Sequence, residues 1–362
     1  MSKYSVKLFQ SLQLFQSLEG EWRQLLSLSS GDSIFLSWEW LYTWSKYYLG
    51  NNRSLFIILV YRERELIGIA PWYLSRKTFG PFMIKQLEFL GSPETGSDYL
   101  DVIIKRGEEE KAASIIYSYL FNDCKKTWDA WFFSDVPSTS LYFNKFFGLL
   151  ENSGKFYEIK KGSFCPQVNL PSSSENFYDS LSCNRRQQYK RHSRILNENG
   201  NLAHITGEGL KSKIFLNELH RLYNKRWGKG HDLFFQFIEE FIDRTHLNNT
   251  VQIDLLRKDN DYIAGILHLN HKESQYMYLM AIDVLYNKKI SIGNVFVGMC
   301  IQNAIEKKLT KYDFLKGKED FKFHWANTGN SSMNIYCYRN RPASVVLYSI
   351  NCLKNIGKIT LR

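Results

Sequence analysis

The sequence predicts an α/β protein of the α+β type, built from two similar halves. At roughly 150 residues per domain, a chain of 362 residues suggests two domains. Residues 54–74 read as a β-hairpin with the polar turn "RERE", which is an antiparallel element. A similar turn and return strand occur at 257–269, with Gly68 and Gly265 in equivalent places. One short match is a weak repeat signal, but it favours a duplicated domain.

The first half mixes strands and helices. After the hairpin, strands are expected at 85–92 and 97–105, joined by the loop "GSPETGS". A helix is expected at 107–120, with its three glutamates in the first turn, where the helix dipole favours negative charge. The proline- and serine-rich stretch "CPQVNLPSSSENF" marks a boundary, so the N-terminal domain is predicted at residues 1–165.

The second half repeats this mixture. A basic helix is expected within 182–200, followed by two more helices, a three-strand meander at 251–283 and a helix at 291–308. Strands at 311–315 and 333–339 end the C-terminal domain, predicted at 166–340. Residues 341–362 are expected to form a tail helix packed on the body, with membrane anchoring as the alternative.

The charge favours an anionic partner. The chain has 47 Lys and Arg against 36 Asp and Glu, a net charge of +11. A phosphorylated cofactor, a nucleotide-linked sugar, nucleic acid or peripheral contact with an acidic membrane surface would each fit. Because the excess is not gathered into a long basic tail, a DNA-binding arm is not expected.

The cysteines point to a reduced compartment. Six cysteines are scattered singly with no Cys-x-x-Cys pair, which is typical of reduced, buried thiols. The predicted location is therefore the cytoplasm, either free or associated with the inner membrane surface. The N-terminus reads neither as a signal peptide nor as a membrane span. His268 and His271 fall on opposite faces of one strand, so no metal site is expected.

The junction "YMYLMAIDVLYNKKISIGNVF" is the main candidate binding element. A strand ends near Asp283, and after two lysines Ser291 and Gly293 open an amphipathic helix. A helix N-terminus directs free N–H groups outward and attracts anions such as a pyrophosphate. An ordinary strand–helix turn capped by Ser291 is the alternative.

The order of these elements resembles that of the GNAT acyltransferase fold. The chain resembles the CelD-like acetyltransferases, which are double-GNAT proteins related to the Fem aminoacyl transferases. The resembling pieces run in order from residue 35 to 325: "FLSWEWLYTW", "LIGIAPWYL", "LEFLGS", "SDYLDVII", "RRQQYKRHSRILNENG", "LHRLYNKRW", "SIGNVF" and "YDFLKGKEDFKFHW". The resemblance implies tandem GNAT domains, each with a mixed, largely antiparallel sheet flanked by helices.

The resemblance also implies acyl-CoA, most simply acetyl-CoA, as the donor and no metal. The residues expected to bind the donor lie around the junction: Ile282, Asp283, Lys289, Ser291, Ile292, Gly293 and Asn294. Backbone N–H groups near Ile282 and Asp283 would polarise the acyl carbonyl. The usual GNAT loop reads Gln/Arg-x-x-Gly-x-Gly/Ala; Gly293 matches it, whereas Ile290 and Val295 depart from it.

Four residues are candidates for the chemistry. Lys322 lies in Phe-Lys-x-x-Trp, which resembles a lysine near the reacting centre of Fem-type enzymes, and Glu319 is a candidate general base if the fold buries it. A structural Lys–Glu pair is the rival interpretation. Asp98 and Asp101 lie on an expected strand, where they would orient or deprotonate an amine if they face a cleft; a solvated strand face or a turn cap is the alternative.

The acceptor would bind through aromatic and basic side chains. These candidates are Tyr99, Arg186, Lys190, Trp227, Lys318 and Trp325. A solvated basic helix and a core tryptophan are the alternative interpretations of the helix 182–200 and of Trp227.

The predicted function is transfer of an acyl group from acyl-CoA to an amine or hydroxyl of a sugar, nucleotide-sugar or related acceptor, in polysaccharide or cell-envelope biosynthesis. One alternative keeps the fold and takes the acyl group from aminoacyl-tRNA to a peptidoglycan-type acceptor. Another is a non-catalytic binding protein on the same fold.

Overall fold

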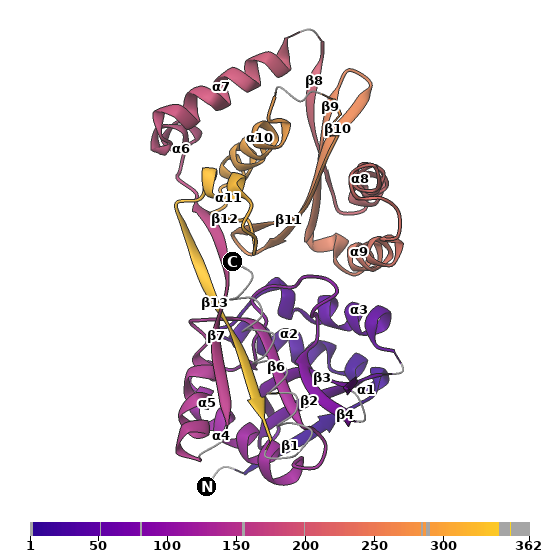
Figure 1. Cartoon of the computed structure of the whole chain (residues 1–362), viewed down its shortest axis with the longest axis vertical. Coiled ribbons are helices and arrows are strands. Elements are labelled where there is room, and N and C mark those ends of the chain that lie inside the picture. Colours follow the sequence, from indigo (N-terminus) through magenta and orange to yellow (C-terminus); the bar gives the residue numbers. More distant parts are fainter. Residues whose placement is uncertain are drawn as a thin grey trace. The chain divides into compact units, whose positions relative to one another are not determined.

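The computed structural model describes residues 3–50, 52–79, 82–153, 156–198, 200–283, 285–286, 290–339 and 348. The chain forms two compact units (Figure 1): unit 1 is Met1–Ser163 with Ser331–Arg362, and unit 2 is Phe164–Asn330. The expected tail helix lies outside the described residues, apart from Tyr348. In the described part of the chain, no helix combines the length and apolar character needed to span a membrane.

Unit 1 is a largely antiparallel sheet with helices. Its strands are paired in the order β1-β2-β3-β4-β6-β13, and the short β5 pairs with β3. Its elements are β1 (Tyr4–Phe9), α1 (Leu12–Ser17), α2 (Glu19–Leu28), α3 (Trp38–Tyr48), β2 (Arg53–Arg62), β3 (Glu65–Phe79), β4 (Phe82–Phe89), β5 (Ile103–Ile104), α4 (Glu109–Ser118), β6 (Ala130–Pro137) and α5 (Leu141–Asn152), with short turns at η1 (Ile34–Leu36) and η2 (Tyr119–Asp123).

Unit 2 has the same character. Its strands are paired in the order β7-β12-β11-β10-β9-β8. Its elements are α6 (Ser174–Ser180), α7 (Cys183–Asn197), β8 (Leu202–Glu208), α8 (Lys211–Trp227), α9 (Asp232–Thr245), η3 (His246–Asn248), β9 (Val251–Lys258), β10 (Asp261–His271), β11 (Ser274–Ile282), α10 (Ile292–Glu306), β12 (Lys311–Asp313) and α11 (Asp320–Trp325). Two strands cross the unit boundary: β7 (Tyr157–Asn169) belongs to unit 2 from Phe164 onward, and β13 (Thr328–Tyr338) belongs to unit 1 from Ser331 onward. Helix α8 packs on β9, β10 and β11, whereas α10 packs on the opposite face of the sheet and contacts α7 on its outer side (Figure 1).

The two units repeat one order of elements. The order starts at β1 in unit 1 and at β8 in unit 2: a strand and helices, a three-strand antiparallel meander, a helix, and a strand parallel to the end of the meander. The parallel pairs are β4 with β6 in unit 1 and β11 with β12 in unit 2. The predicted α+β class with largely antiparallel sheets is therefore confirmed.

The last strand of each repeat serves the other unit. The C-terminal part of β7 pairs with β12, with Val168 opposite Tyr312. The C-terminal part of β13 pairs with β6, with Cys337 opposite Trp131. Residues Ser331–Tyr338 are thus part of unit 1, whereas the sequence-based limits assign them to the second half.

The expected strand at 97–105 is wrong. Only Ile103–Ile104 form a strand, and the preceding segment is irregular. The hydroxyls of Thr95 and Ser97 donate to the Gly91 carbonyl at 2.9 and 2.6 Å, and such local side-chain bonds compete with strand pairing. Asp98 and Asp101 therefore lie in this irregular segment and not on a strand.

Glycine 265 lets helix α8 approach the sheet. A Cβ atom at this position would lie 2.9 Å from Leu219 Cδ1 on α8 and 3.0 Å from Leu255 Cδ2 on β9. Both leucines are fully buried, so the space between helix and sheet is already filled.

We expect Gly265→Ala to destabilise the protein by about 1–3 kcal/mol, because a methyl group added to a filled core displaces its neighbours. Chemical denaturation measures the change. Gly20→Ala is the matched control, since a Cβ at Gly20 in α2 meets nothing within 4 Å and alanine favours helices. Equal stability of Gly265→Ala and the native protein would contradict the packing argument.

Candidate functional site in unit 2

The site begins where β11 and β12 separate. The two strands pair in parallel over only three residues each, Ser274–Tyr276 with Lys311–Asp313. Strand β11 then continues to Ile282, paired with β10 on one side and with no described strand on the other. The register of β11 with β10 shifts so that Tyr278 is an extra, bulged residue opposite Leu267 and His268. Bulges redirect the backbone and are frequent beside active sites.

Helix α10 presents an uncapped N-terminus at this point. The Ser291 side chain makes no capping hydrogen bond, contrary to the simple capped-turn interpretation. The amides of Gly293 and Asn294 have no intrahelical carbonyl to bond, because they lie in the first turn. A Cβ at Gly293 would lie 2.6 Å from Ile282 Cδ1, so glycine allows the first turn to lie against the end of β11.

A pocket of about 440 Å³ opens at this helix end. Its walls come from the end of β11, the first turn of α10, the end of α8 and the segment before α11. The lining residues are Arg226, Met280, Ile282, Asp283, Ile290, Ser291, Ile292, Gly293, Asn294, Glu319 and Phe321. Six of the seven residues predicted to bind the donor line this pocket together with Glu319, while Lys289 lies outside the described residues.

The pocket carries one cation that the sequence interpretation missed. Arg226 comes from the last turn of α8, next to the predicted Trp227. The Asp283 carboxylate is neutralised by Lys225, whose Nζ donates to Oδ2 at 2.6 Å. Burial opposes this ionisation, but the bonds from Lys225 and the Leu285 amide outweigh it and hold the pKa of Asp283 below its usual value.

One predicted role at Asp283 is wrong. Its backbone N–H donates to the Ile263 carbonyl at 2.8 Å, continuing the ladder between β10 and β11. The amide of Asp283 therefore cannot also polarise an acyl carbonyl, and the free donors lie in the first turn of α10 instead.

Glu319 and Lys322 form a pair at the edge of the pocket. The Lys322 side chain is 9% exposed, and its Nζ donates to the Lys316 carbonyl at 2.7 Å and lies 3.2 Å from Glu319 Oε2. The Glu319 side chain is 57% exposed, so the burial expected of a general base is absent. The buried ammonium fixes the turn that brings Glu319 to the pocket.

The two acceptor candidates on the basic helix α7, Arg186 and Lys190, do not line the recess that this helix forms with α10. Arg186 donates to Asp179 at 2.8 Å, and Lys190 is exposed. A second, narrow recess beside α10 is lined from α7 by Arg185, Gln188, Tyr189 and His192, together with Asn294, Val295, His324 and Trp325. The spacing i, i+3, i+4, i+7 of the α7 residues is the signal that would have identified this face.

The remaining acceptor candidates in unit 2 differ in exposure. Trp325 is 5% exposed and stacks on Phe177, so it belongs to the core and reaches the recess with one edge. Its indole Nε1 has no hydrogen-bond partner among the described residues. Trp227 is 46% exposed and lies against Arg226 rather than in the core, and Lys318 is exposed.

Three of the predicted site residues, Asp98, Tyr99 and Asp101, belong to unit 1. Asp101 is buried, and its Oδ1 accepts from Ser140 Oγ at 2.9 Å and from the Val102 amide at 2.7 Å. Burial raises the pKa of Asp101 to about 7, against the lowering effect of both hydrogen bonds. Asp98 is also buried, and Tyr99 has a φ of 56° in the loop between them.

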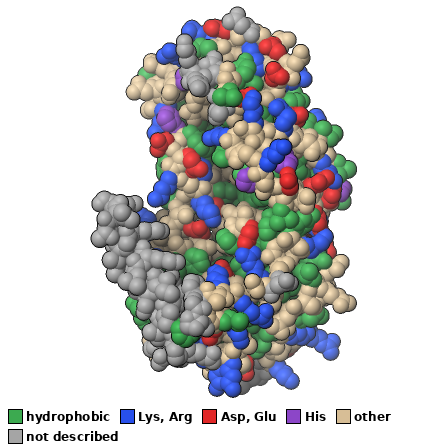
Figure 2. Space-filling model, turned by 45° about the vertical axis from the view of Figure 1, so that its right-hand side comes forward, with side chains coloured by type: hydrophobic (Ala, Val, Ile, Leu, Met, Phe, Trp, Pro, Cys, Tyr) green, Lys and Arg blue, Asp and Glu red, His purple; other side chains and the backbone are tan. Residues whose placement is uncertain are grey.

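Charge is distributed rather than gathered over the face shown in Figure 2. Lys and Arg side chains alternate there with Asp and Glu. Positive charge is denser on α7, where residues 183–197 contain five Lys and Arg and no acid.

Comparison with known proteins agrees with this geometry. Residues 184–323, which lie within unit 2, match the family model described as an acetyltransferase (GNAT) domain. No functionally curated protein is significantly similar in sequence.

Three solved structures share the fold across most of both chains. FemX has a TM-score of 0.61 at 12% identity and covers 96% of this chain and 99% of its own. L-PGS from Bacillus licheniformis has a TM-score of 0.53 at 13% identity, covering 92% and 96%. The C-terminal domain of a putative lysylphosphatidylglycerol synthetase from Agrobacterium fabrum has a TM-score of 0.51 at 11% identity, covering 94% and 97%.

The fold, the helix N-terminus beside the parting strands and the family match define one class of protein. The chain is a GNAT-type acyltransferase, with its acetyltransferase domain in unit 2. It shares the two-unit fold of FemX.

Asp101 should make stability depend on pH. Its pKa rises from an ordinary 3.8 to about 7 on folding, so the native state binds a proton that the unfolded state has released. The contribution of this carboxyl to stability is therefore greatest below pH 4 and falls as the pH rises to 7, by on the order of 2–4 kcal/mol. We expect Asp101→Asn to remove this component of the slope in urea titrations between pH 5 and 8.

Asp179→Asn is the control for this experiment, because the Asp179 side chain is 73% exposed. If Asp101→Asn and Asp179→Asn show the same pH dependence as the native chain, the Asp101 carboxyl is not buried as the structure has it.

Proposed function

We propose that the protein transfers an acyl group, most simply acetyl, from acyl-CoA to an amine or hydroxyl of a sugar, a nucleotide-sugar or a related acceptor. The observation that carries the proposal is the uncapped first turn of α10, which lines a pocket of about 440 Å³ beside the parting strands. A use in polysaccharide or cell-envelope biosynthesis, as in the CelD-like proteins that the chain resembles, goes with this acceptor class.

The pocket suits the phosphates and the arm of the donor. Free amides and the dipole of a 15-residue helix attract a pyrophosphate, and Arg226 adds a full positive charge. Met280, Ile282, Ile292 and Phe321 line the same pocket with apolar groups that suit the uncharged arm of the molecule. GNAT domains in general use acyl-CoA, which is the donor that this arrangement fits.

The reaction needs a positioned nucleophile and a stabilised oxyanion. The amine or hydroxyl of the acceptor attacks the thioester carbonyl, the CoA thiolate leaves, and the nucleophile releases one proton. Glu319 lines the pocket and is our candidate to accept that proton. Lys322 holds Glu319 in position through the ion pair between its Nζ and Glu319 Oε2. Asp98 and Asp101 remain candidates for the chemistry, and the proposed acceptor contacts remain Tyr99, Arg186, Lys190, Trp227, Lys318 and Trp325.

Acetyl-CoA should stabilise the protein through the pocket. At a concentration 100 times its Kd, a ligand that binds only the native state adds about 2.7 kcal/mol, which raises the melting temperature. We expect Gly293→Val to abolish the shift, because the added side chain meets Ile282 and covers the first-turn amides. Gly148→Val on α5 is the control, since a Cβ there meets nothing within 4 Å.

The outcome also decides between donors. A shift with acetyl-CoA that Gly293→Val removes supports the proposal, and no shift with any acyl-CoA contradicts it. The alternative donor, aminoacyl-tRNA, is favoured by the basic helix α7. It would be supported by tRNA binding that weakens steeply with salt while acyl-CoA has no effect.

Lys322→Met tests the pair at the edge of the pocket. Loss of the ammonium frees the turn from Lys316 to Glu319, so kcat should fall by about tenfold or more while the KM for acetyl-CoA changes little. Steady-state kinetics measure both, and the exposed Lys308→Met is the control. A rise in KM alone would place Lys322 in donor binding instead.

A further inference from the structure

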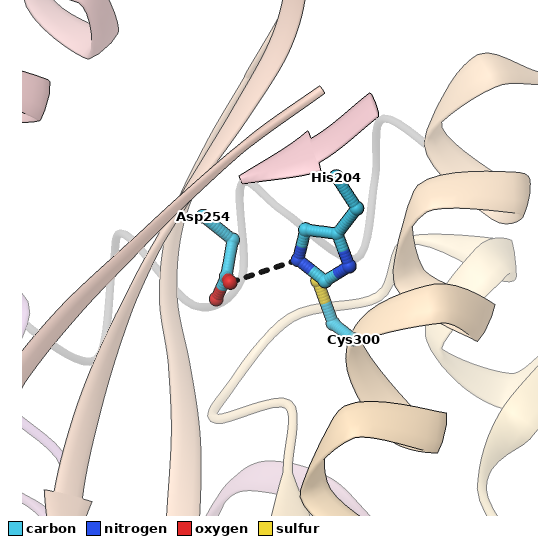
Figure 3. Close-up of side chains that lie close together, drawn as sticks. All are labelled: His204, Asp254 and Cys300. Atoms are coloured by element: carbon cyan, nitrogen blue, oxygen red, sulfur yellow. Dashed lines mark hydrogen bonds and ion pairs between the residues drawn. The ribbon is translucent and has the colours of Figure 1, made fainter. Parts of the chain in front are cut away.

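Three side chains with different metal-binding atoms meet inside unit 2. His204 comes from β8, Asp254 from β9 and Cys300 from α10, and their ligand atoms all lie within 4.8 Å of one another. Figure 3 shows the Asp254 carboxylate directed at the imidazole of His204, with the Cys300 sulfur beside the same ring. The pocket at the first turn of α10 uses none of the three residues.

Asp254 is a carboxylate buried in the interior of unit 2, whose core includes Leu256, Phe296 and Ile301. Its side chain is 0% exposed, and its Oδ1 lies 2.8 Å from His204 Nε2. A buried carboxylate needs hydrogen-bond donors or a cation in contact with it.

The polar groups around Asp254 hold the carboxylate in a fixed orientation. Thr206 donates to Oδ1 at 2.6 Å and Gln252 to Oδ2 at 2.6 Å, while His268 Nδ1 lies 2.9 Å from Oδ2. His268 is itself held by Tyr312, whose hydroxyl lies 2.8 Å from Nε2. Partners of this kind orient the carboxylates that bind metals in proteins.

A thiol nucleophile is excluded at this place. The arrangement in space, with the His204 ring between Asp254 and Cys300, resembles the triad of a thiol enzyme. However, Cys300 is 1% exposed, so no substrate can reach it. Burial, together with the Asp254 carboxylate, raises the pKa of the Cys300 thiol well above its usual value, so the free thiol is a neutral group.

We propose that His204, Asp254 and Cys300 bind a divalent transition metal, with zinc as the ion that best fits the donor set. Zinc prefers nitrogen and sulfur ligands and accepts carboxylates, whereas calcium and magnesium require oxygen ligands throughout. One Zn²⁺ with one thiolate and one carboxylate has a net charge of zero, which suits the apolar surroundings. The inference does not depend on the proposed substrate.

The proton balance of binding is defined. The metal replaces the thiol proton of Cys300, and one proton is released to solvent. To bind the metal through Nε2, His204 would give up its hydrogen bond to Asp254 and carry its ring proton on Nδ1 instead. No electron is transferred, because zinc has no redox chemistry.

The metal would join the edge strand β8 to the helix that carries the donor pocket. β8 ends the sheet of unit 2, and Cys300 lies two turns along α10 from the first-turn amides. We therefore expect zinc to stabilise unit 2 without entering the reaction.

The test uses the full-length, untagged chain. Zinc content after purification and dialysis is measured by mass spectrometry of the metal, and a cobalt(II) titration reports a thiolate-to-cobalt charge-transfer band. We expect one metal per chain, a charge-transfer band, and a higher melting temperature with zinc. Cys300→Ala should weaken binding by more than about 100-fold, since even the loss of an outer partner of a ligand costs about 10–100-fold.

Cys165→Ala is the matched control, because Cys165 is also a buried thiol of unit 2 and lies outside the cluster. It should keep the metal and the cobalt band. Should Cys300→Ala fail to fold, His204→Gln, at a side chain that is 18% exposed, provides the same comparison. If the native chain binds neither zinc nor cobalt at one equivalent, or if Cys300→Ala keeps the cobalt band, the proposal is wrong, whatever acyl-CoA does in the thermal-shift assay.

Discussion

In unit 2, strands β11 and β12 pair in parallel over three residues and then part, and the features of the site depend on this separation. Beyond Tyr276 the end of β11 is free on one side, so the first turn of α10 can lie against Ile282. The chain that follows β12 leaves the sheet at Asp313 and returns as the segment that brings Glu319 and Phe321 to the pocket. Two strands that stayed paired to their ends would leave no room for these amides, because sheet pairing would fill the same space.

Apolar side chains of the loop at the start of α10 pack in the core of unit 2, so the positive charge near this loop must come from another element. Ile290 and Val295 stand where the usual GNAT pattern has a basic and a small residue, and both are buried in the unit 2 core. Under the proposed function, anion binding at this loop would depend on backbone amides, which any sequence supplies, and on a cation from another element. Arg226 at the end of α8 lines the same pocket and would provide that cation through the packing of α8 on the sheet.

Much of the fold could be predicted from the sequence, because hydrophobic periodicity and turn residues are local signals. They gave the hairpin β2–β3, the meander β9–β11 and helix α10. The resemblance to GNAT proteins selected the donor residues, six of which line one pocket. The failures have identifiable physical causes. Local hydrogen bonds from the hydroxyls of Thr95 and Ser97 to the Gly91 carbonyl replace part of an expected strand. Packing on α10, which lies far away in the sequence, decides which face of α7 lines the recess between them. His204, Asp254 and Cys300 form no recognisable motif in the sequence, because only the pairing of β8 with β9 and the packing of α10 bring them together.

The exchange of final strands has a consequence for how the protein is made. β6 lies in the first half of the chain, but its partner β13 is among the last described segments to leave the ribosome. Domains generally fold one after another during synthesis, at about 5–20 residues per second. The sheet of unit 1 cannot follow this order, because an edge of β6 must wait, unpaired, while all of unit 2 is translated. Exposed strand edges promote aggregation, so the interval between translation of β6 and β13 is the period in which the nascent chain most needs protection.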